Sequence, residues 1–374
     1  MDNPQGVALT KLRGQDDPDT EDDDDELSVY GVNAGKNEII YNTSLLNIEI
    51  YRGEPGTPES LQNPRGIACN ASGDVYVADK DNGRIAHLFN EEGKNLVYRS
   101  DSRPNAENFR PFDVTLASGG DLFVSDSAGS KIWTWDSSTH HWKVLIDSID
   151  TPLGIVSYDR NDEWTRYKQS RLGIICENGK KVVITDFEGR KLSGYKPEEK
   201  NAALRYIATD YYNNYYLTDA ANGRIIKIDR HGKLIDTIGS EGKGDYQFQH
   251  PQGIAVWKRF GQVCVAESYA AQYYLIGTDI LATDLSRNGE TLRLSFELTE
   301  RADVTITVMQ PGKSEVDTLV DDRRVPQGGF THRWEIPENA REGEYVFRIS
   351  AVPSYSSTKF FRANRVIRRD FKHN

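Results

Sequence analysis

One sequence cassette recurs through the first three quarters of this chain and constrains the fold more than any other feature. It runs Pro-x-Gly, an apolar strand, a glycine turn, a second strand ending in Asp or Glu, an Asn-Gly-basic turn and a third strand. Clear copies occupy 64–89, 111–136 and 206–229, a fourth begins at Pro251, and two weaker copies with insertions open at Pro4 and Pro152. The six copies begin roughly 40 to 60 residues apart, which suits one four-stranded propeller blade per copy.

The chemistry of the cassette predicts strands joined by tight turns. Asn82-Gly83 suits a two-residue hairpin turn, whose central residues need positive φ angles. The strand 74–79, DVYVAD, places apolar side chains on both of its faces. One such sheet cannot bury two apolar faces alone, whereas a ring of stacked sheets buries all of them. The sequence therefore predicts an all-β fold with a six-bladed β-propeller over residues 1–280.

The segments PRGIA, GDVYVAD and NGRI between 64 and 85, with their counterparts in the other copies, resemble the NHL repeat. The resemblance covers about residues 4–279 and implies a six-bladed propeller. The sixth copy lacks an obvious fourth strand, and we expect residues upstream of Met1 to supply it. We also expect a cleaved signal peptide to precede the chain.

A different β pattern begins at about Leu281. The segments TLRLSFELTE, ADVTITVMQ and GEYVFRISAVPS alternate apolar and polar residues, as strands of a β-sandwich do. With Trp334 between the last two, they resemble the immunoglobulin-like domain named after the flagellar hook-capping protein (FlgD-like). We predict such a sandwich over 281–374, with a basic C-terminal segment. In bacteria these modules occur on secreted and surface proteins, so the resemblance implies an extracytoplasmic location, whether periplasmic, secreted or at the cell surface.

The charge distribution limits the classes of partner. The formal net charge is −11, and nine acids lie between Asp16 and Glu26, inside a predicted insertion at 14–27. Because binding to nucleic acid requires a basic face, we expect no nucleic-acid partner. No apolar run approaches the ~20 residues that span a bilayer, so we expect no membrane span. The three cysteines are too few and too scattered for a disulfide framework or a thiolate metal site.

The acidic insertion is interpreted as a solvated loop, because it lacks the glycine and the ligand spacing of an EF-hand. Loose Ca²⁺ binding or contact with a basic partner are the alternatives. No cofactor is expected, and calcium is the one metal that the sequence suggests. The candidate metal ligands are Asp22, Asp23, Asp24, Asp25 and Glu26.

The residues that open the inner strands are the candidates for a channel site. Arg65 and Arg205 occupy equivalent positions and form a candidate anion-binding pair. Gln5 and Gln252 open two further inner strands, and His250 lies close to one of them. No carboxylate or imidazole recurs beside these residues, so no catalytic residue is assigned. The NHL family includes an amidating lyase with a histidine-held zinc, but the histidines of this chain are too scattered to match it.

Candidate partner contacts lie outside the predicted core. Trp142 and Trp164 fall in a turn and an insertion. Arg365, Arg368 and Arg369 form a basic C-terminal segment that could pair head to tail with the acidic insertion of a second copy. Self-association of this kind is one expected partner mode.

These features favour a noncatalytic, secreted or surface-exposed binding and scaffolding propeller that presents loops to a protein or glycan partner. One alternative is a metal-dependent propeller enzyme, a lyase or hydrolase, with its site at the central channel. A second alternative is a structural subunit of a surface assembly. Fold alone does not choose among them.

Overall fold

The computed structural model describes residues 1–15, 27–43, 47–90, 93–311, 316–337, 342–355 and 362–371. The chain divides into two compact units, Met1–Tyr274 and Leu275–Asn374. The division falls slightly before the predicted boundary at 280. The all-β prediction is confirmed, because strands and short 3-10 turns make up the regular structure of the described residues. Among these residues no helix has the length and apolar character needed to cross a membrane.

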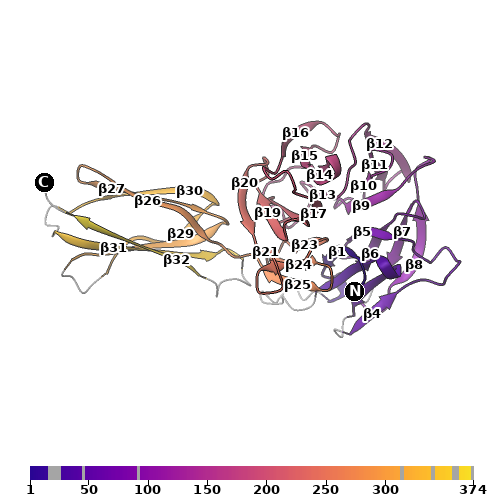
Figure 1. The fold of residues 1–374 in the computed structure, drawn as a ribbon, viewed down its shortest axis with the longest axis horizontal. Coiled ribbons are helices and arrows are strands. Elements are labelled where there is room, and N and C mark those ends of the chain that lie inside the picture. Colours follow the sequence, from indigo (N-terminus) through magenta and orange to yellow (C-terminus); the bar gives the residue numbers. More distant parts are fainter. Residues whose placement is uncertain are drawn as a thin grey trace. The chain divides into compact units, whose positions relative to one another are not determined.

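Each cassette forms one antiparallel sheet in the first unit (Figure 1). In the described residues, five of these sheets have four strands and the sixth has three. The strands are β1 (Pro4–Thr10), β2 (Ser28–Asn33), β3 (Glu38–Asn42) and β4 (Ile48–Tyr51); β5 (Pro64–Cys69), β6 (Asp74–Asp79), β7 (Arg84–Phe89) and β8 (Val97–Ser102); β9 (Pro111–Leu116), β10 (Leu122–Asp126), β11 (Lys131–Asp136) and β12 (His141–Ile146); β13 (Ile155–Tyr158), β14 (Arg171–Cys176), β15 (Lys181–Thr185) and β16 (Lys191–Tyr195); β17 (Leu204–Thr209), β18 (Tyr215–Asp219), β19 (Arg224–Ile228) and β20 (Leu234–Ile238); and β23 (Ile254–Trp257), β24 (Gln262–Ala266) and β25 (Ala271–Leu275).

Short elements complete the first unit. A two-stranded parallel pair, β21 (Ser240–Glu241) and β22 (Gln247–Phe248), precedes the sixth sheet. Three 3-10 turns lie in or beside hairpins of the first and fourth sheets. These turns are η1 (Arg13–Gln15), η2 (Ala34–Lys36) and η3 (Glu177–Gly179).

The first strand of each sheet is the inner strand, and the inner strands follow one another around a ring. Each of β1, β5, β9, β13, β17 and β23 lies against the next, and β23 lies against β1. Backbone hydrogen bonds cross between neighbours, for example from the Gly253 N–H to the Gln5 carbonyl at 3.0 Å. No single sheet closes on itself. The arrangement is therefore a propeller-like ring of open sheets.

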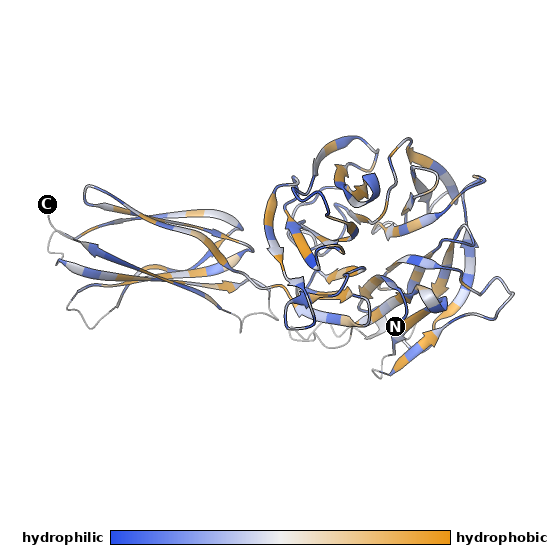
Figure 2. Ribbon diagram, viewed as in Figure 1, coloured by the Kyte–Doolittle hydropathy of each residue, from blue (hydrophilic) through white to orange (hydrophobic). Residues whose placement is uncertain are grey.

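Apolar side chains between neighbouring sheets hold the ring together. One buried cluster joins Ala78 and Ile85 of the second sheet to Val114, Leu122 and Val124 of the third. Figure 2 shows the hydrophobic colour along the strands and the hydrophilic colour in many of the loops that connect them. Burial of both faces of each sheet explains why the strands read as continuous apolar runs in the sequence.

In five of the six sheets, a buried polar side chain at the end of the second strand binds the segment that leads into the inner strand. In the second sheet, the Gln62 N–H donates to Asp79 Oδ1 at 2.7 Å. The same tie joins Arg110 N–H to Asp126 at 3.1 Å and Ala203 N–H to Asp219 at 2.9 Å. Asn33 and Glu267 make equivalent bonds in the first and sixth sheets, to Asp2 N–H and Gln249 N–H. In the fourth sheet, where Cys176 ends β14, a backbone bond from Glu177 N–H to the Asp150 carbonyl takes this place.

A layer of small residues lets the inner strands approach one another closely at the centre of the ring. Gly6, Gly66, Gly154 and Gly253 occupy the third position of their cassettes, and a Cβ on any of them would lie within 3 Å of a neighbouring residue. In the third and fifth sheets this position holds Asp113 and Tyr206 instead. Both side chains are buried. These two residues are therefore the large side chains of an otherwise glycine-lined layer.

The Asp113 carboxyl is held by backbone donors on two inner strands. The Val114 N–H and the Ile155 N–H donate to its two oxygens, each at 2.9 Å. Burial raises the pKa of Asp113 to about 8, although these hydrogen bonds favour the charged form. The carboxyl thus stays largely protonated at neutral pH.

The second unit contains two antiparallel sheets around one core. The strands are β26 (Ile280–Asn288), β27 (Thr291–Leu298), β28 (Ala302–Met309), β29 (Val316–Val325), β30 (Gly328–Glu335), β31 (Gly343–Pro353) and β32 (Ala363–Phe371). The sheet orders are β26-β27-β30 and β29-β28-β31-β32. Phe296 of the first sheet and Ile306 and Phe347 of the second lie in the shared core, and Trp334 contacts Phe347 with ring centroids 5.8 Å apart. The finer immunoglobulin-like, FlgD-like assignment stays a prediction.

Replacing Asp79 with alanine should destabilise the ring strongly. The change removes the acceptor for Gln62 N–H, for Asn82 Nδ2 at 2.7 Å and for Arg84 Nε at 2.8 Å. Loss of one partner of a buried ion pair costs about 3–5 kcal/mol. We expect a large drop in the urea midpoint of unfolding, followed by tryptophan fluorescence. Asp147→Ala, which removes an exposed partner of Lys131, is the matched control and should leave the midpoint almost unchanged. Equal shifts for the two variants would contradict the structural role of Asp79.

The raised pKa of Asp113 predicts a distinctive pH dependence of stability. Between the ordinary Asp pKa and about 8, the folded state keeps a proton that the unfolded state has lost, so stability falls as pH rises. The Asp113→Asn variant has no titrating group at this position. The difference in unfolding free energy between wild type and Asp113→Asn should therefore decline across that window by up to about 1.4 kcal/mol per pH unit. Parallel stability curves for the two proteins would contradict the assignment.

Candidate functional site

A cavity of about 490 Å³ opens at the end of the ring where the inner strands begin. We call it the mouth cavity. Its size falls within the range of small-molecule sites. Four cationic side chains line it, and we call them the mouth cations: Arg65, Lys80, Arg110 and Arg205. Phe112 and Leu153 supply apolar surface, and Ser127 and Asn178 supply polar groups.

The fold brings the mouth cations together from three sheets. Arg65 and Arg205 are the second residues of β5 and β17, Lys80 follows the last residue of β6, and Arg110 immediately precedes β9. The carboxylate ties hold these positions, because Asp79 and Asp219 bind the lead-in segments of β5 and β17 and Asp126 binds Arg110 itself. The mouth cations are therefore presented by well-anchored backbone.

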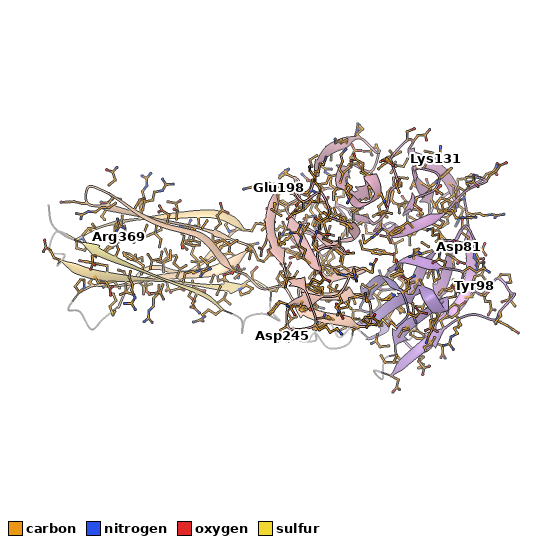
Figure 3. The ribbon with its side chains drawn as sticks, viewed as in Figure 1. Asp81, Tyr98, Lys131, Glu198, Asp245 and Arg369 are labelled. Carbon is orange, nitrogen blue, oxygen red and sulfur yellow. The ribbon has the colours of Figure 1, made fainter. Side chains whose placement is uncertain are left out.

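The mouth cations lack the acidic partners that other basic residues of the cassette have. Arg84 pairs with Asp79 at 2.8 Å and Asp101 at 2.6 Å, and Arg224 pairs with Asp219 and Glu199. Within the described residues, no comparable ion pair is found for Arg65, Lys80, Arg110 or Arg205, and Arg65 Nε is buried with no hydrogen-bond partner. Asp81, labelled in Figure 3 and lying in the turn between β6 and β7, is the acidic residue among those that line the cavity. It is exposed, and Asn63 Nδ2 donates to it at 3.0 Å.

Lys80 has an unusual electrostatic environment. Burial lowers its pKa below the ordinary lysine value, the positive charges of Arg65 and Arg110 lower it further, and Asp81 opposes the shift. A lowered pKa raises the neutral fraction of a lysine at any given pH, and a neutral amine can accept a proton or act as a nucleophile. Lys80 is thus the candidate acid–base group of the mouth cavity.

A second, smaller cavity of about 170 Å³ is lined by all six inner strands. Asp113 and Tyr206 line this inner cavity, whereas Phe112 and Arg205, one residue earlier on the same strands, line the mouth cavity. The two cavities therefore follow one another along the inner strands. Thr209, also on the inner cavity, has a buried hydroxyl without a hydrogen-bond partner among the described residues.

The structure brings together some of the predicted channel residues and separates others. Arg65 and Arg205 both line the mouth cavity. Gln5 is buried and is not part of the cavity lining; the Tyr206 hydroxyl donates to its Oε1 at 3.2 Å. His250 lies with Nδ1 3.0 Å from the Ala220 carbonyl, and Gln252 Nε2 lies 3.4 Å from the His250 carbonyl. The sequence interpretation missed Lys80 and Arg110, although both flank cassette landmarks.

The predicted partner-contact residues make more contacts with other residues of the chain than the sequence suggested. The Trp142 Nε1 donates to Ser102 Oγ at 2.6 Å, and its ring lies 6.1 Å from that of Phe109. The Trp164 ring lies 5.2 Å from the Arg259 guanidinium. Arg365, Arg368 and Arg369 lie on β32, where Arg365 Nε donates to the Ile280 carbonyl and Arg368 pairs with Glu344 at 2.8 Å.

The residues present do not fit a divalent cation at the mouth. No cluster of three or more histidine, cysteine, aspartate or glutamate side chains with metal-ligand geometry occurs in the part of the chain that the structure describes. The mouth cavity has four cationic side chains and one acidic one, a set that repels a metal ion. The candidate ligands Asp22, Asp23, Asp24, Asp25 and Glu26 lie outside the described residues.

Comparisons with known proteins support the repeat and the fold. The NHL repeat model matches residues 61–88. No curated protein matches the chain. Among solved structures, a streptogramin B lyase is similar with a TM-score of 0.51 and 16% identity, covering 72% of this chain and 92% of its own. A gluconolactonase from Xanthomonas campestris gives a TM-score of 0.52 and 9% identity, and the match covers 72% of this chain and 84% of the gluconolactonase. At these identities the similarity concerns the fold alone.

These comparisons correct the main functional prediction. We expected a noncatalytic binding or scaffolding ring, but the similar solved structures are described as a lyase and a lactonase. The similar folds therefore give no support to the noncatalytic prediction. The chain has a propeller-like all-β ring that carries an NHL repeat.

Proposed function

We propose that the ring is a lyase or hydrolase that cleaves an ester-type bond in a small molecule at the mouth cavity. The observation that carries this proposal is the position of Lys80, half-buried on the cavity beside Arg65 and Arg110 and without an acidic ion-pair partner among the described residues. The similar lyase and gluconolactonase support this reaction class at the level of fold. We propose no metal ion for this reaction, because the four cationic side chains of the mouth cavity repel a cation.

The residues of the cavity can perform either cleavage. In hydrolysis, the neutral Lys80 amine accepts a proton from water as the water oxygen bonds to the carbonyl carbon. The arginine side chains stabilise the resulting oxyanion. The C–O bond then breaks, and the proton passes from Lys80 to the departing oxygen. In elimination, the same amine takes a proton from the carbon next to the one that bears the ester oxygen, and a C=C bond forms between these two carbons. The alkyl C–O bond breaks to release a carboxylate, and the protonated Lys80 then returns its proton to water.

We also propose that the ring is a six-bladed propeller of the NHL type. The match at 61–88 and the recurrence of the carboxylate tie in the other sheets support this assignment. In this arrangement the mouth cavity occupies one opening of the central channel, where loops and strand ends from several blades can surround one substrate.

Replacing Lys80 tests the catalytic proposal. Gluconolactone and a streptogramin B are the first substrates, and mass spectrometry separates hydrolysis, which adds one water, from elimination, which conserves mass. Lys80→Met and Lys80→Arg should each lower kcat by at least about 100-fold, because neither side chain accepts a proton. The wild-type kcat/KM should rise with pH and level off below the ordinary lysine pKa of about 10.4.

Lys131→Met is the matched control, because Lys131 is at a surface position and pairs with Asp147. It should keep the wild-type rate. Turnover by Lys80→Arg at the wild-type rate and with the same pH profile would contradict the role of Lys80. Absence of turnover across a panel of lactones and cyclic ester peptides would contradict the proposed function itself.

A further inference from the structure

The mouth cations form a basic basin in an acidic protein. The chain has a formal net charge of −11, yet four cationic side chains and one acidic side chain line this cavity. Cations gathered at one site repel one another, and partial burial strengthens the repulsion. A stable fold holds such a group most easily when an anion joins it. The charge of the basin therefore specifies the sign of its ligand.

Arg65 carries the clearest sign of a missing partner. Its Nε is buried and has no hydrogen-bond partner among the described residues. A buried donor without an acceptor costs free energy, and a buried donor on a charged group costs more. Arg84, on the same sheet, has by contrast two carboxylates and the Ser60 carbonyl as acceptors. Arg65 thus retains donor capacity that the protein itself does not use.

Arg65 and Arg205 act on the same small region of the cavity. Burial raises the pKa of the Tyr206 phenol, Asp113 raises it further, and Arg65 and Arg205 oppose the shift. Both guanidinium groups are therefore close enough to influence one phenol at the base of the mouth. The Phe112 ring, which lines the cavity, lies 5.4 Å from the Tyr206 ring. The cavity that the two arginine side chains line thus also has an aromatic surface, the Phe112 ring.

We propose that Arg65 and Arg205 capture a carboxylate or phosphate group on a small organic ligand, with Lys80 and Arg110 completing the basic basin. This inference rests on the proposed function, because it assigns the enzyme a substrate that bears a permanent oxyanion. Guanidinium groups suit this chemistry, since their planar donors match two oxygens at once. The apolar surface of Phe112 and Leu153 accommodates the uncharged part of the ligand.

Binding of simple anions tests the inference without any turnover. Inorganic phosphate and succinate are titrated into the full chain by calorimetry at constant ionic strength, with chloride as the competing ion. We expect saturable binding of at least one of the two, weakened by added salt. The preferred probe then tells phosphate from carboxylate recognition.

Variants locate the site. Arg65→Lys and Arg205→Lys keep the charge but lose the planar fork, and each should weaken binding of the preferred probe about 10-fold or more. Arg65→Ala/Arg205→Ala should abolish measurable binding. Arg190→Ala is the matched control, because the exposed Arg190 pairs with Asp186 and Glu188 away from the mouth. Circular dichroism and thermal unfolding confirm that each variant is folded.

The outcomes separate this inference from the proposed function. Lys80→Met should lose turnover but still bind the anion, since it keeps both arginine side chains. Anion binding without turnover of any lactone would support the anion site and defeat the proposed enzyme. Equal binding by wild type, Arg190→Ala and the folded double variant, or no binding of either probe, would overturn the anion site even where turnover of a neutral lactone is found.

Discussion

The hydrogen bond from a lead-in N–H to a buried side chain at the end of the second strand is the interaction on which the ring depends. In five of the six sheets it joins the start of the inner strand to the hairpin of the same sheet, as the 2.7 Å bond from Gln62 N–H to Asp79 Oδ1 shows. A buried carboxylate is tolerated there because several donors surround it, including Asn82 and Arg84. The repeated Asp of the cassette is thus a structural residue.

This constraint explains which charges are free for a ligand. Arg84 and Arg224 follow the Asn-Gly turns and are used by Asp79 and Asp219. Arg65 and Arg205 lie on the inner strands that these ties position, and they face the cavity without an acidic partner among the described residues. The same repeat therefore supplies one set of cations for architecture and another for recognition.

The sequence predicted the ring better than the site, for physical reasons. Turn chemistry and apolar strands are local signals, so they located the sheets and placed Arg65 and Arg205 at equivalent positions. Lys80 gave no separate signal, because it follows a structural Asp inside a turn. Asp113 was hidden because it replaces a glycine at one cassette position, and its pKa is raised by burial, which depends on the packing of strands that are distant in the sequence. The noncatalytic interpretation rested on the absence of a recurring carboxylate or imidazole, a pattern that the proposed role of Lys80 does not require.

The layer of glycines with Asp113 and Tyr206 determines where a ligand can be held. The glycines let the inner strands approach closely, and the two large side chains occupy the space that remains near the axis. Four of the five charged residues that line the mouth cavity are cationic, whereas the layer itself holds a carboxyl that is largely protonated at neutral pH. An ionised Asp113 would offset the positive field of Arg65 and Arg205, so the burial that raises its pKa also preserves the attraction of the mouth for an anion.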